Sequence, residues 1–189
     1  MTGPNEIEIK LRVREVSPIL ERIRSAGYRE SVARVFEANT LYDTPQHSLR
    51  EKQTLLRLRD AGGRSVITWK GPPVAGPHKN RPEIETTLGS ADAMARIFQE
   101  LGYQPTFRYE KFRTEFARPG APGTITLDET PIGNFLELEG PADWIDETAE
   151  QLGFQRSEYI LDSYGKLYVA DCQRRGVPPT HMVFAERSA

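Results

Sequence analysis

Apolar and polar residues alternate along most of the chain, which is the pattern of half-buried β-strands. In residues 5–13, isoleucine, leucine and valine take the odd positions after Asn5, and charged residues take the even ones. Similar alternation predicts further strands at residues 29–42, 54–60, 64–70, 81–88, 107–117, 124–128 and 134–139. Short turn-forming stretches separate several neighbouring segments, so we expect a mostly antiparallel sheet.

Helical spacing interrupts this alternation and predicts a few flanking helices. Ser17 and Ser90 are good N-capping residues, and Gly27 and Gly102 are good helix stops. The predicted helices cover residues 17–26, 90–101, 144–152 and 160–172, with a short helical turn at 47–52. These elements place the chain in the α+β class. We expect residues 1–175 to form a single domain and residues 176–189 to form a flexible tail.

Composition narrows the range of partners. The 189 residues carry 25 basic and 27 acidic side chains, a net charge of −2, which argues against a basic surface for nucleic acid. No apolar run approaches the ~18 residues of a membrane helix, and residues 1–9 lack the order of a signal peptide. One cysteine and three scattered histidines offer neither a disulfide nor a zinc cluster, and we expect the histidines in loops or at the surface. The sequence therefore predicts a cytoplasmic protein with no nucleic-acid or membrane partner.

Charged residues recur two positions apart on the predicted strands. Residues i and i+2 of a strand share one face, so each of these pairs lies opposite a row of apolar side chains. The same-face groups are Glu6, Glu8 and Lys10; Arg57 and Arg59; Glu83 and Glu85; Lys111 and Arg113; and Glu137 and Glu139, with Lys70 and Asp128 at single positions.

Two interpretations of this ionic face compete. A solvated outer face is the ordinary explanation for any one pair. Against it, acids and bases segregate onto different strands, and the polar face contains little besides charge. A closed eight-stranded barrel would instead turn these faces into a lumen, where buried charges require partners. Carboxylates bind Mg²⁺ or Mn²⁺, and arginine and lysine bind phosphate, so such a lumen would hold a polyanion such as a triphosphate.

Several motifs make the sequence resemble a known family. The segment Glu6-x-Glu8-x-Lys10 resembles the ExExK signature of the CYTH domain, whose members are also called triphosphate tunnel metalloenzymes. The resemblance continues to about Leu167 through LLRLRD, VITWKGP, RPEIET, EKFRTEF, TLDETPIGNFLELEG and LDSYGKLY. It points to the branch of CyaB-like class IV adenylate cyclases and thiamine triphosphatases, and implies an eight-stranded antiparallel tunnel with a hydrophilic interior.

The resemblance also implies a role for each charged position. Glu6, Glu8 and Lys10 would be catalytic. The metal-facing acids would be Glu6, Glu8, Asp128, Glu137 and Glu139. The substrate phosphates would be held by Lys10, Arg57, Arg59, Lys70, Arg81, Lys111 and Arg113. Glu83 and Glu85 would support the basic residues, and the resemblance is compatible with a homodimer.

The activity stays open between two reactions. Family members hydrolyse inorganic, thiamine or nucleoside triphosphates, or convert ATP to cyclic AMP and pyrophosphate. Class IV cyclases carry a His-Phe pair before the ExExK strand, and its absence from residues 1–5 favours hydrolysis. The WKGP and GNFLELEG stretches resemble the cyclase branch. A module that binds nucleotide or polyphosphate without turnover is a third interpretation.

Overall fold

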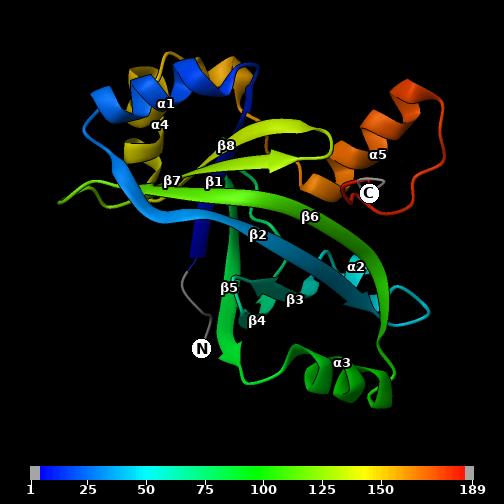
Figure 1. Cartoon of the computed structure of the whole chain (residues 1–189). Helices are drawn as coiled ribbons and strands as arrows, with labels where there is room; N and C mark the ends of the chain where they lie inside the picture. The colour runs from blue at the N-terminus through cyan, green and yellow to red at the C-terminus, as the bar shows by residue number, and fades with distance from the viewer. Residues whose placement is uncertain (1–4, 186–189) are drawn as a thin grey trace.

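The fold is an antiparallel barrel that closes on itself, seen in a computed structural model that describes residues 5–185 (Figure 1). Neighbouring strands follow the order β1-β5-β4-β3-β2-β6-β7-β8, and β8 pairs back with β1. The strands are β1 Asn5–Val13, β2 Arg29–Asp43, β3 Leu55–Ala61, β4 Arg64–Lys70, β5 Lys79–Leu88, β6 Gln104–Ala117, β7 Thr124–Thr130 and β8 Gly133–Glu139. The prediction of an α+β fold around an eight-stranded antiparallel barrel is confirmed.

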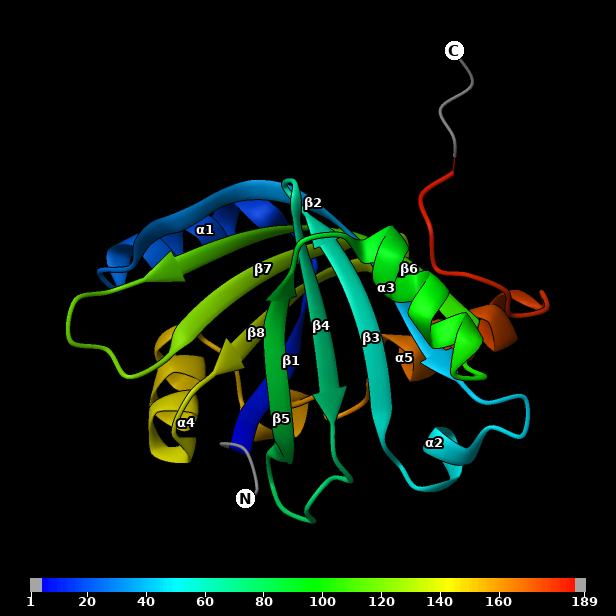
Figure 2. The ribbon, with the colours of Figure 1, turned by 90° about the horizontal axis from the view of Figure 1, so that it is seen from below.

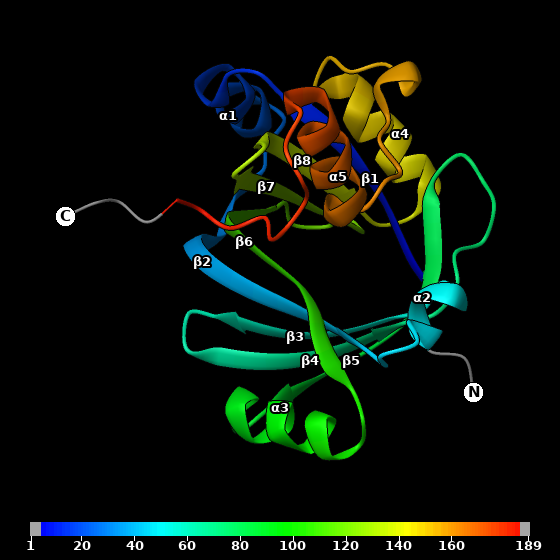
Figure 3. The same cartoon turned by 90° about the vertical axis from the view of Figure 1, so that its right-hand side faces the viewer.

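Helices cover the outside of the barrel. They are α1 Val16–Ser25, α2 Ser48–Glu51, α3 Ala91–Glu100, α4 Ala142–Gln151 and α5 Tyr164–Arg175, with a 3₁₀ turn at Arg156–Glu158. Helix α3 lies along the outside of the strand wall that Figure 2 shows face on. Figure 3 shows α1 and α4 on the opposite side of the barrel from α3. No helix within residues 5–185 is long and apolar enough to cross a membrane.

Three of the predicted helix starts are wrong, and one of these is α4, which begins at Ala142 instead of residue 144. Helix α1 begins at Val16, and the side chain of the predicted cap Ser17 lies within the helix. Helix α5 begins at Tyr164 with Ser163 as its cap, whereas residue 160 was included in the predicted helix. Ile160 instead exchanges both backbone hydrogen bonds with Lys10, at 2.9 and 3.0 Å, and so extends the sheet beside β1. Ser90 does cap α3, as predicted.

The segment expected to fray after Arg175 is held against the barrel. The backbone N–H of Met182 donates to the carbonyl of Arg108, and the N–H of Glu110 donates to the carbonyl of Met182. Met182 is fully buried and packs with Tyr168 and Cys172 of α5. The expectation of a flexible tail is therefore wrong for this segment, because one buried methionine and an added strand edge anchor it. Residues 186–189 lie outside the described part of the chain.

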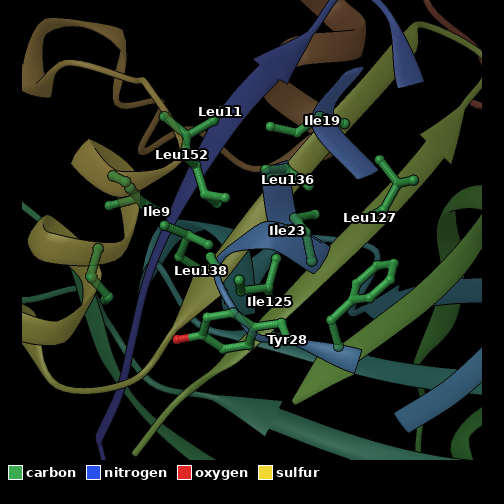
Figure 4. Close-up of a cluster of buried hydrophobic side chains, with 14 of the residues drawn as sticks. Ile9, Leu11, Ile19, Ile23, Tyr28, Ile125, Leu127, Leu136, Leu138 and Leu152 are labelled. Atoms are coloured by element: carbon green, nitrogen blue, oxygen red, sulfur yellow. The ribbon is translucent and has the colours of Figure 1, made fainter. Parts of the chain in front are cut away.

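The main hydrophobic core lies outside the barrel wall, between β1, β7, β8 and the helices α1 and α4 (Figure 4). Its fully buried members include Ile9 and Leu11 of β1, Leu136 and Leu138 of β8, and Ile23 of α1. Since successive strand residues point to opposite faces, this packing turns Glu8, Lys10 and Glu137 inward. Burial of the apolar faces outside the barrel thus creates an ionic interior.

Candidate functional site: an ionic cavity inside the barrel

The inward faces of the strands enclose a cavity of about 350 Å³. Its volume suits a small ligand, and charged side chains dominate its lining. These are Glu6, Glu8, Lys10, Arg57, Arg59, Lys70, Lys79, Arg81, Glu83, Glu85, Lys111, Arg113, Glu115, Glu137 and Glu139. The interpretation of the ionic face as a solvated exterior is therefore wrong, and most of the predicted site residues meet in one cavity.

Strands β1 and β8 build an acidic wall around one lysine. The Nζ atom of Lys10 lies 2.9 Å from Glu8 Oε1 and 3.1 Å from Glu137 Oε1, and only 2 % of Lys10 is exposed. Burial alone would raise the pKa values of both carboxyls. Lys10 and Lys79 outweigh burial at Glu8, and Lys10 and Arg113 outweigh it at Glu137, so both pKa values lie below the usual range. Both acids are therefore ionised at neutral pH.

A surplus of carboxylates lies beside this wall. Lys70 Nζ is shared by Glu6, at 2.5 Å, and Glu83, at 3.0 Å. Burial and the nearby charge of Glu8 raise the pKa of Glu6 to about 7. Burial and Glu8 also raise the pKa of Glu139, which makes no ion pair within the described residues. Burial and the neighbouring carboxylates therefore both disfavour the charged forms of Glu6 and Glu139.

The part of the wall formed by β6 is basic and is braced by a buried acid. Asp128 accepts hydrogen bonds from Lys111 at 2.8 Å, from both Nε and Nη2 of Arg113 at 2.7 Å, and from the hydroxyl of Tyr164 at 2.7 Å. It is fully buried behind these side chains and does not line the cavity. Of the acids predicted to face metal, Asp128 is the one that this structure does not bring to the cavity surface.

Two arginines of β3 face the cavity and share Glu85 as an ionic partner. Arg59 lies 3.2 Å from Glu85 and 3.8 Å from Glu37. Arg57 donates hydrogen bonds to the hydroxyls of Tyr109, at 3.2 Å, and Thr68, at 3.0 Å, and its Nη2 lies 3.5 Å from Glu85 Oε2. The buried Nε of Arg57 has no hydrogen-bond partner among residues 5–185. The hydrogen bonds that orient Arg57 thus come from neutral groups, and its ionic partner Glu85 is shared with Arg59, which leaves positive charge available to an anion in the cavity.

Arg81 has a structural task at the cavity edge. Its guanidinium donates to the backbone carbonyls of Gly71 at 2.8 Å, Gln53 at 3.1 Å and Lys70 at 3.4 Å. These bonds tie the ends of β3, β4 and β5 together while part of the side chain lines the cavity. Most of its donors are therefore occupied by the protein itself.

Sequence reasoning did not assign site roles to four residues at or behind the cavity wall. Lys79 pairs with Glu8, and Tyr109 accepts the bond from Arg57. Glu37 lies 3.5 Å from Lys111. The ring of Tyr164 lies 5.2 Å from the Lys10 ammonium and 5.4 Å from that of Lys111. The two-residue period could have found Lys79, two before Arg81, and Tyr109, two before Lys111; the role of Tyr164 depends on packing alone.

One corner of the cavity is apolar. Leu41 of β2, Leu55 of β3 and Phe107 of β6 line it together with Gly165 at the start of α5. Leu41 pairs directly with Phe107 across the sheet, and all three side chains are partly exposed. A Cβ at Gly165 would stand 3.7 Å from the Phe107 ring, an ordinary van der Waals distance, so the start of α5 packs close beside this corner. The cavity therefore combines a charged lining, suited to a polyanion, with a small apolar rim.

The acids also fit a divalent cation. Among the described residues, no three acidic, histidine or cysteine side chains stand close enough to hold a metal ion by themselves. Mg²⁺ is commonly held by one or two carboxylates plus phosphate oxygens of the substrate. Glu6, Glu8, Glu137 and Glu139 supply oxygen ligands of the right kind, and the raised pKa values of Glu6 and Glu139 mark a place where added positive charge is favourable.

A closed antiparallel barrel with an ionic lumen defines a tunnel-type β-barrel protein. The family model of the CYTH domain matches residues 4–166 of this sequence. The chain belongs to the CYTH domain family, as the sequence motifs predicted.

Known relatives agree with this assignment. A Methanocaldococcus jannaschii protein, provisionally named an adenylate cyclase, is 28 % identical over 134 residues, which cover 71 % of this chain and 75 % of the relative. A Vibrio parahaemolyticus crystal structure with a similar provisional name superposes with a TM-score of 0.78 at 22 % identity, covering 87 % of this chain and 98 % of the other. A Hippeastrum protein described as having a dominant triphosphatase activity gives a TM-score of 0.59 at 17 % identity, covering 92 % and 97 %. At these identities the two structures support the fold.

Proposed function

We propose that this protein is a divalent-metal-dependent triphosphatase that hydrolyses the terminal phosphoanhydride of a small triphosphate inside the barrel. The observation that carries this proposal is that one cavity is lined both by cationic side chains and by carboxylates. Cationic side chains from β1, β3, β4 and β6 face carboxylates from β1, β5 and β8. A simple polyanion binder would need only the cations, because uncompensated acids repel phosphate.

The basic residues bind and orient the polyphosphate chain. Phosphoryl transfer depends mainly on positioning and on stabilising charge at the phosphate oxygens. Lys111 and Arg113 are rigidly braced by Asp128, so they present fixed positive charge. Arg57, Arg59, Lys70 and Lys10 extend this charge along the cavity, whereas Arg81 mainly holds its edge.

The carboxylates Glu6, Glu8, Glu137 and Glu139 would hold Mg²⁺ or Mn²⁺ together with phosphate oxygens of the substrate. When bound, such an ion neutralises phosphate charge and lowers the pKa of a coordinated water. Glu8 and Glu137 are ionised and hydrogen-bonded to Lys10, which fixes their orientation. Burial and the charge of Glu8 raise the pKa values of Glu6 and Glu139, and a bound cation would favour their ionised forms.

Adenylate cyclase activity is the second candidate, and the apolar rim favours it. Leu41, Leu55 and Phe107 offer a surface for an organic group that inorganic triphosphate lacks. The provisional names of the M. jannaschii and V. parahaemolyticus relatives point the same way, while the description of the Hippeastrum protein points to hydrolysis. Cyclisation would use the same basic lining, because both reactions stabilise charge on a triphosphate.

A product assay separates the candidates. The full chain is incubated with tripolyphosphate, thiamine triphosphate or ATP, with Mg²⁺ or Mn²⁺, and with a chelator as the control. Release of inorganic phosphate supports hydrolysis. Formation of equal amounts of cyclic AMP and pyrophosphate from ATP would overturn the triphosphatase proposal in favour of cyclisation. Tight, metal-independent triphosphate binding with no product under any condition would instead identify a binding module.

A pair of variants then tests the site assignment. Glu8→Gln keeps the size of the side chain but removes an ionised carboxylate from the acidic wall. Glu147→Gln makes the same change on the exposed face of α4, outside the cavity. Product formation should fall at least about 100-fold in Glu8→Gln, the usual scale for one electrostatic group, and stay unchanged in Glu147→Gln. Unchanged turnover in Glu8→Gln would overturn the assignment.

A further inference from the structure

A contact outside the cavity ties one of its lysines to the hydrophobic core. His78, expected in a loop or at the surface, is 8 % exposed, and its Nε2 lies 2.9 Å from Asp146 Oδ1 on α4. The same oxygen accepts a bond from the Tyr159 hydroxyl at 3.0 Å, and Arg156 reaches the other carboxylate oxygen at 2.5 Å. Neighbours of Asp146 on α4, such as Ile145 and Ala149, are fully buried in the main core. His78 therefore contacts a firmly anchored helix.

His78 immediately precedes Lys79, whose ammonium pairs with Glu8 inside the cavity. Strand β5 begins at Lys79, and there it pairs with β1 but not yet with β4, whose ladder with β5 starts at Glu83. The loop before His78 is exposed from residue 72 to residue 77. On the loop side of Lys79, the chain is thus held by the buried His78 and by the backbone hydrogen bond from Val74 to Asn80.

We propose that the His78–Asp146 contact is a latch that fixes Lys79 in the cavity wall, which makes His78 and Asp146 positioning residues for triphosphate binding. This inference rests on the proposed function and extends it to residues outside the cavity. Asp146 holds His78, His78 holds the start of β5, and the start of β5 holds the Lys79 ammonium beside Glu8. Without the latch, the chain before β5 would keep the Val74–Asn80 backbone hydrogen bond but lose its buried side-chain anchor, and the Lys79 ammonium would be less firmly placed.

The experiment is a double-mutant cycle on kinetics. His78→Ala should raise KM for the preferred triphosphate about tenfold, the scale of one charge-assisted contact, and change kcat less than about twofold. Lys79→Met should do the same, and the double variant should be no worse than Lys79→Met alone. His78→Gln, whose amide can still donate to Asp146, should recover much of the loss. Glu147→Gln, the neighbouring position on α4, is the matched control and should keep the wild-type KM.

Several outcomes overturn the latch. They are a wild-type KM in both His78→Ala and Asp146→Asn, or effects of His78→Ala and Lys79→Met that simply multiply. Asp146→Asn is the milder variant if His78→Ala does not fold. If the wild-type protein forms no product, the same cycle is measured as the Kd for tripolyphosphate by calorimetry, so failure of the proposed activity does not decide the latch. Absence of any triphosphate binding overturns both.

Discussion

On β1 and β8, apolar side chains of the outer face and charged side chains of the inner face alternate along the strand. On the outer face, Leu138 is fully buried among aliphatic side chains of α1, α4 and the neighbouring strands. On the inner face, Glu137 contacts Lys10 and Arg113 and borders an open cavity. Both faces exclude most water, but only the outer one gains free energy from doing so.

This difference separates stability from function within the same strands. Apolar burial outside stabilises the barrel, whereas the buried charges inside are costly unless each finds a partner. The inner partners are incomplete, since Glu139 makes no ion pair and Arg57 Nε has no acceptor among the described residues. A bound polyanion would supply an acceptor for Arg57, and a cation bound with it would pair with Glu139. The comparison therefore predicts that changes on the two faces affect different measurements.

The sharpest test on the inner face is Arg57→Met. Arg57 donates to the hydroxyls of Tyr109 and Thr68, and its ionic partner Glu85 is also paired with Arg59, so loss of Arg57 leaves no carboxylate without a cation. We expect kcat/KM for triphosphate to fall about 100- to 1000-fold while the unfolding midpoint moves by only a few degrees. Arg34→Met, which removes an arginine from the outer surface beside Glu129, should change neither. A stable Arg57→Met variant with full activity would break the comparison.

On the outer face, Leu138→Ala should have the converse effect. Removing a fully buried leucine leaves a cavity and should lower the free energy of unfolding by about 3 kcal/mol. Urea denaturation measures this loss, and the kcat of the folded fraction should stay within about threefold of wild type. Leu101→Ala at an exposed site next to α3 is the control and should cost little. Equal losses in the two variants would contradict the location of the core.

Close packing on the outside can be tested by overfilling it. A Cβ at Gly123 would lie 2.4 Å from the Trp144 ring and 2.6 Å from the carbonyl oxygen of Glu139. Gly123→Ala should therefore lower the free energy of unfolding by about 2 kcal/mol, measured by thermal denaturation. Gly89→Ala, where nothing lies within 4 Å, is the matched control. Equal stability of the two variants would show that the Trp144 contact adapts at little cost.

The smallest predicted effect is a pH dependence from the inner face. Burial and Glu8 raise the pKa of Glu6 from 4.5 to about 7, so the folded state binds this proton more tightly than the unfolded state. Stability should consequently decrease as pH rises from about 4.5 to 7, in metal-free buffer, by at least about 1 kcal/mol. Glu139 acts with the same sign. Glu8 and Glu137 have lowered pKa values and therefore lose their contribution only in more acidic solution.

Glu6→Gln checks this assignment by replacing the proton-binding group with a neutral one. Chemical denaturation at several pH values should give a flatter profile in the variant, and greater stability than wild type at pH 8. Glu100→Gln at an exposed position of α3 should leave the profile unchanged. A wild-type profile in Glu6→Gln would mean that another group titrates.

Much of the fold could be predicted because the alternation that identifies a barrel strand is visible in the residues of that strand. The alternation of Ile7, Ile9 and Leu11 with charged residues identifies the strand and separates its apolar face from its charged face. Capping by Ser90 is equally local and was predicted correctly. The errors lie where distant partners decide: Ile160 joins Lys10 across the sheet instead of starting a helix, and Met182 is anchored by β6 and α5. The buried contact of His78 with Asp146 is of the same long-range kind.

The sequence by itself determined which side chains share a strand face, since a period of two residues is a property of the extended backbone. The ionic faces follow from this period, and the motifs along these strands resemble those of the CYTH family. Only the tertiary structure decided how those charges are used: Asp128 braces cations from behind, Arg81 binds backbone carbonyls, and Lys79 enters the cavity beside Glu8. The reason is that a strand face specifies a direction, whereas the depth and partners of a side chain depend on which strands and helices pack around it.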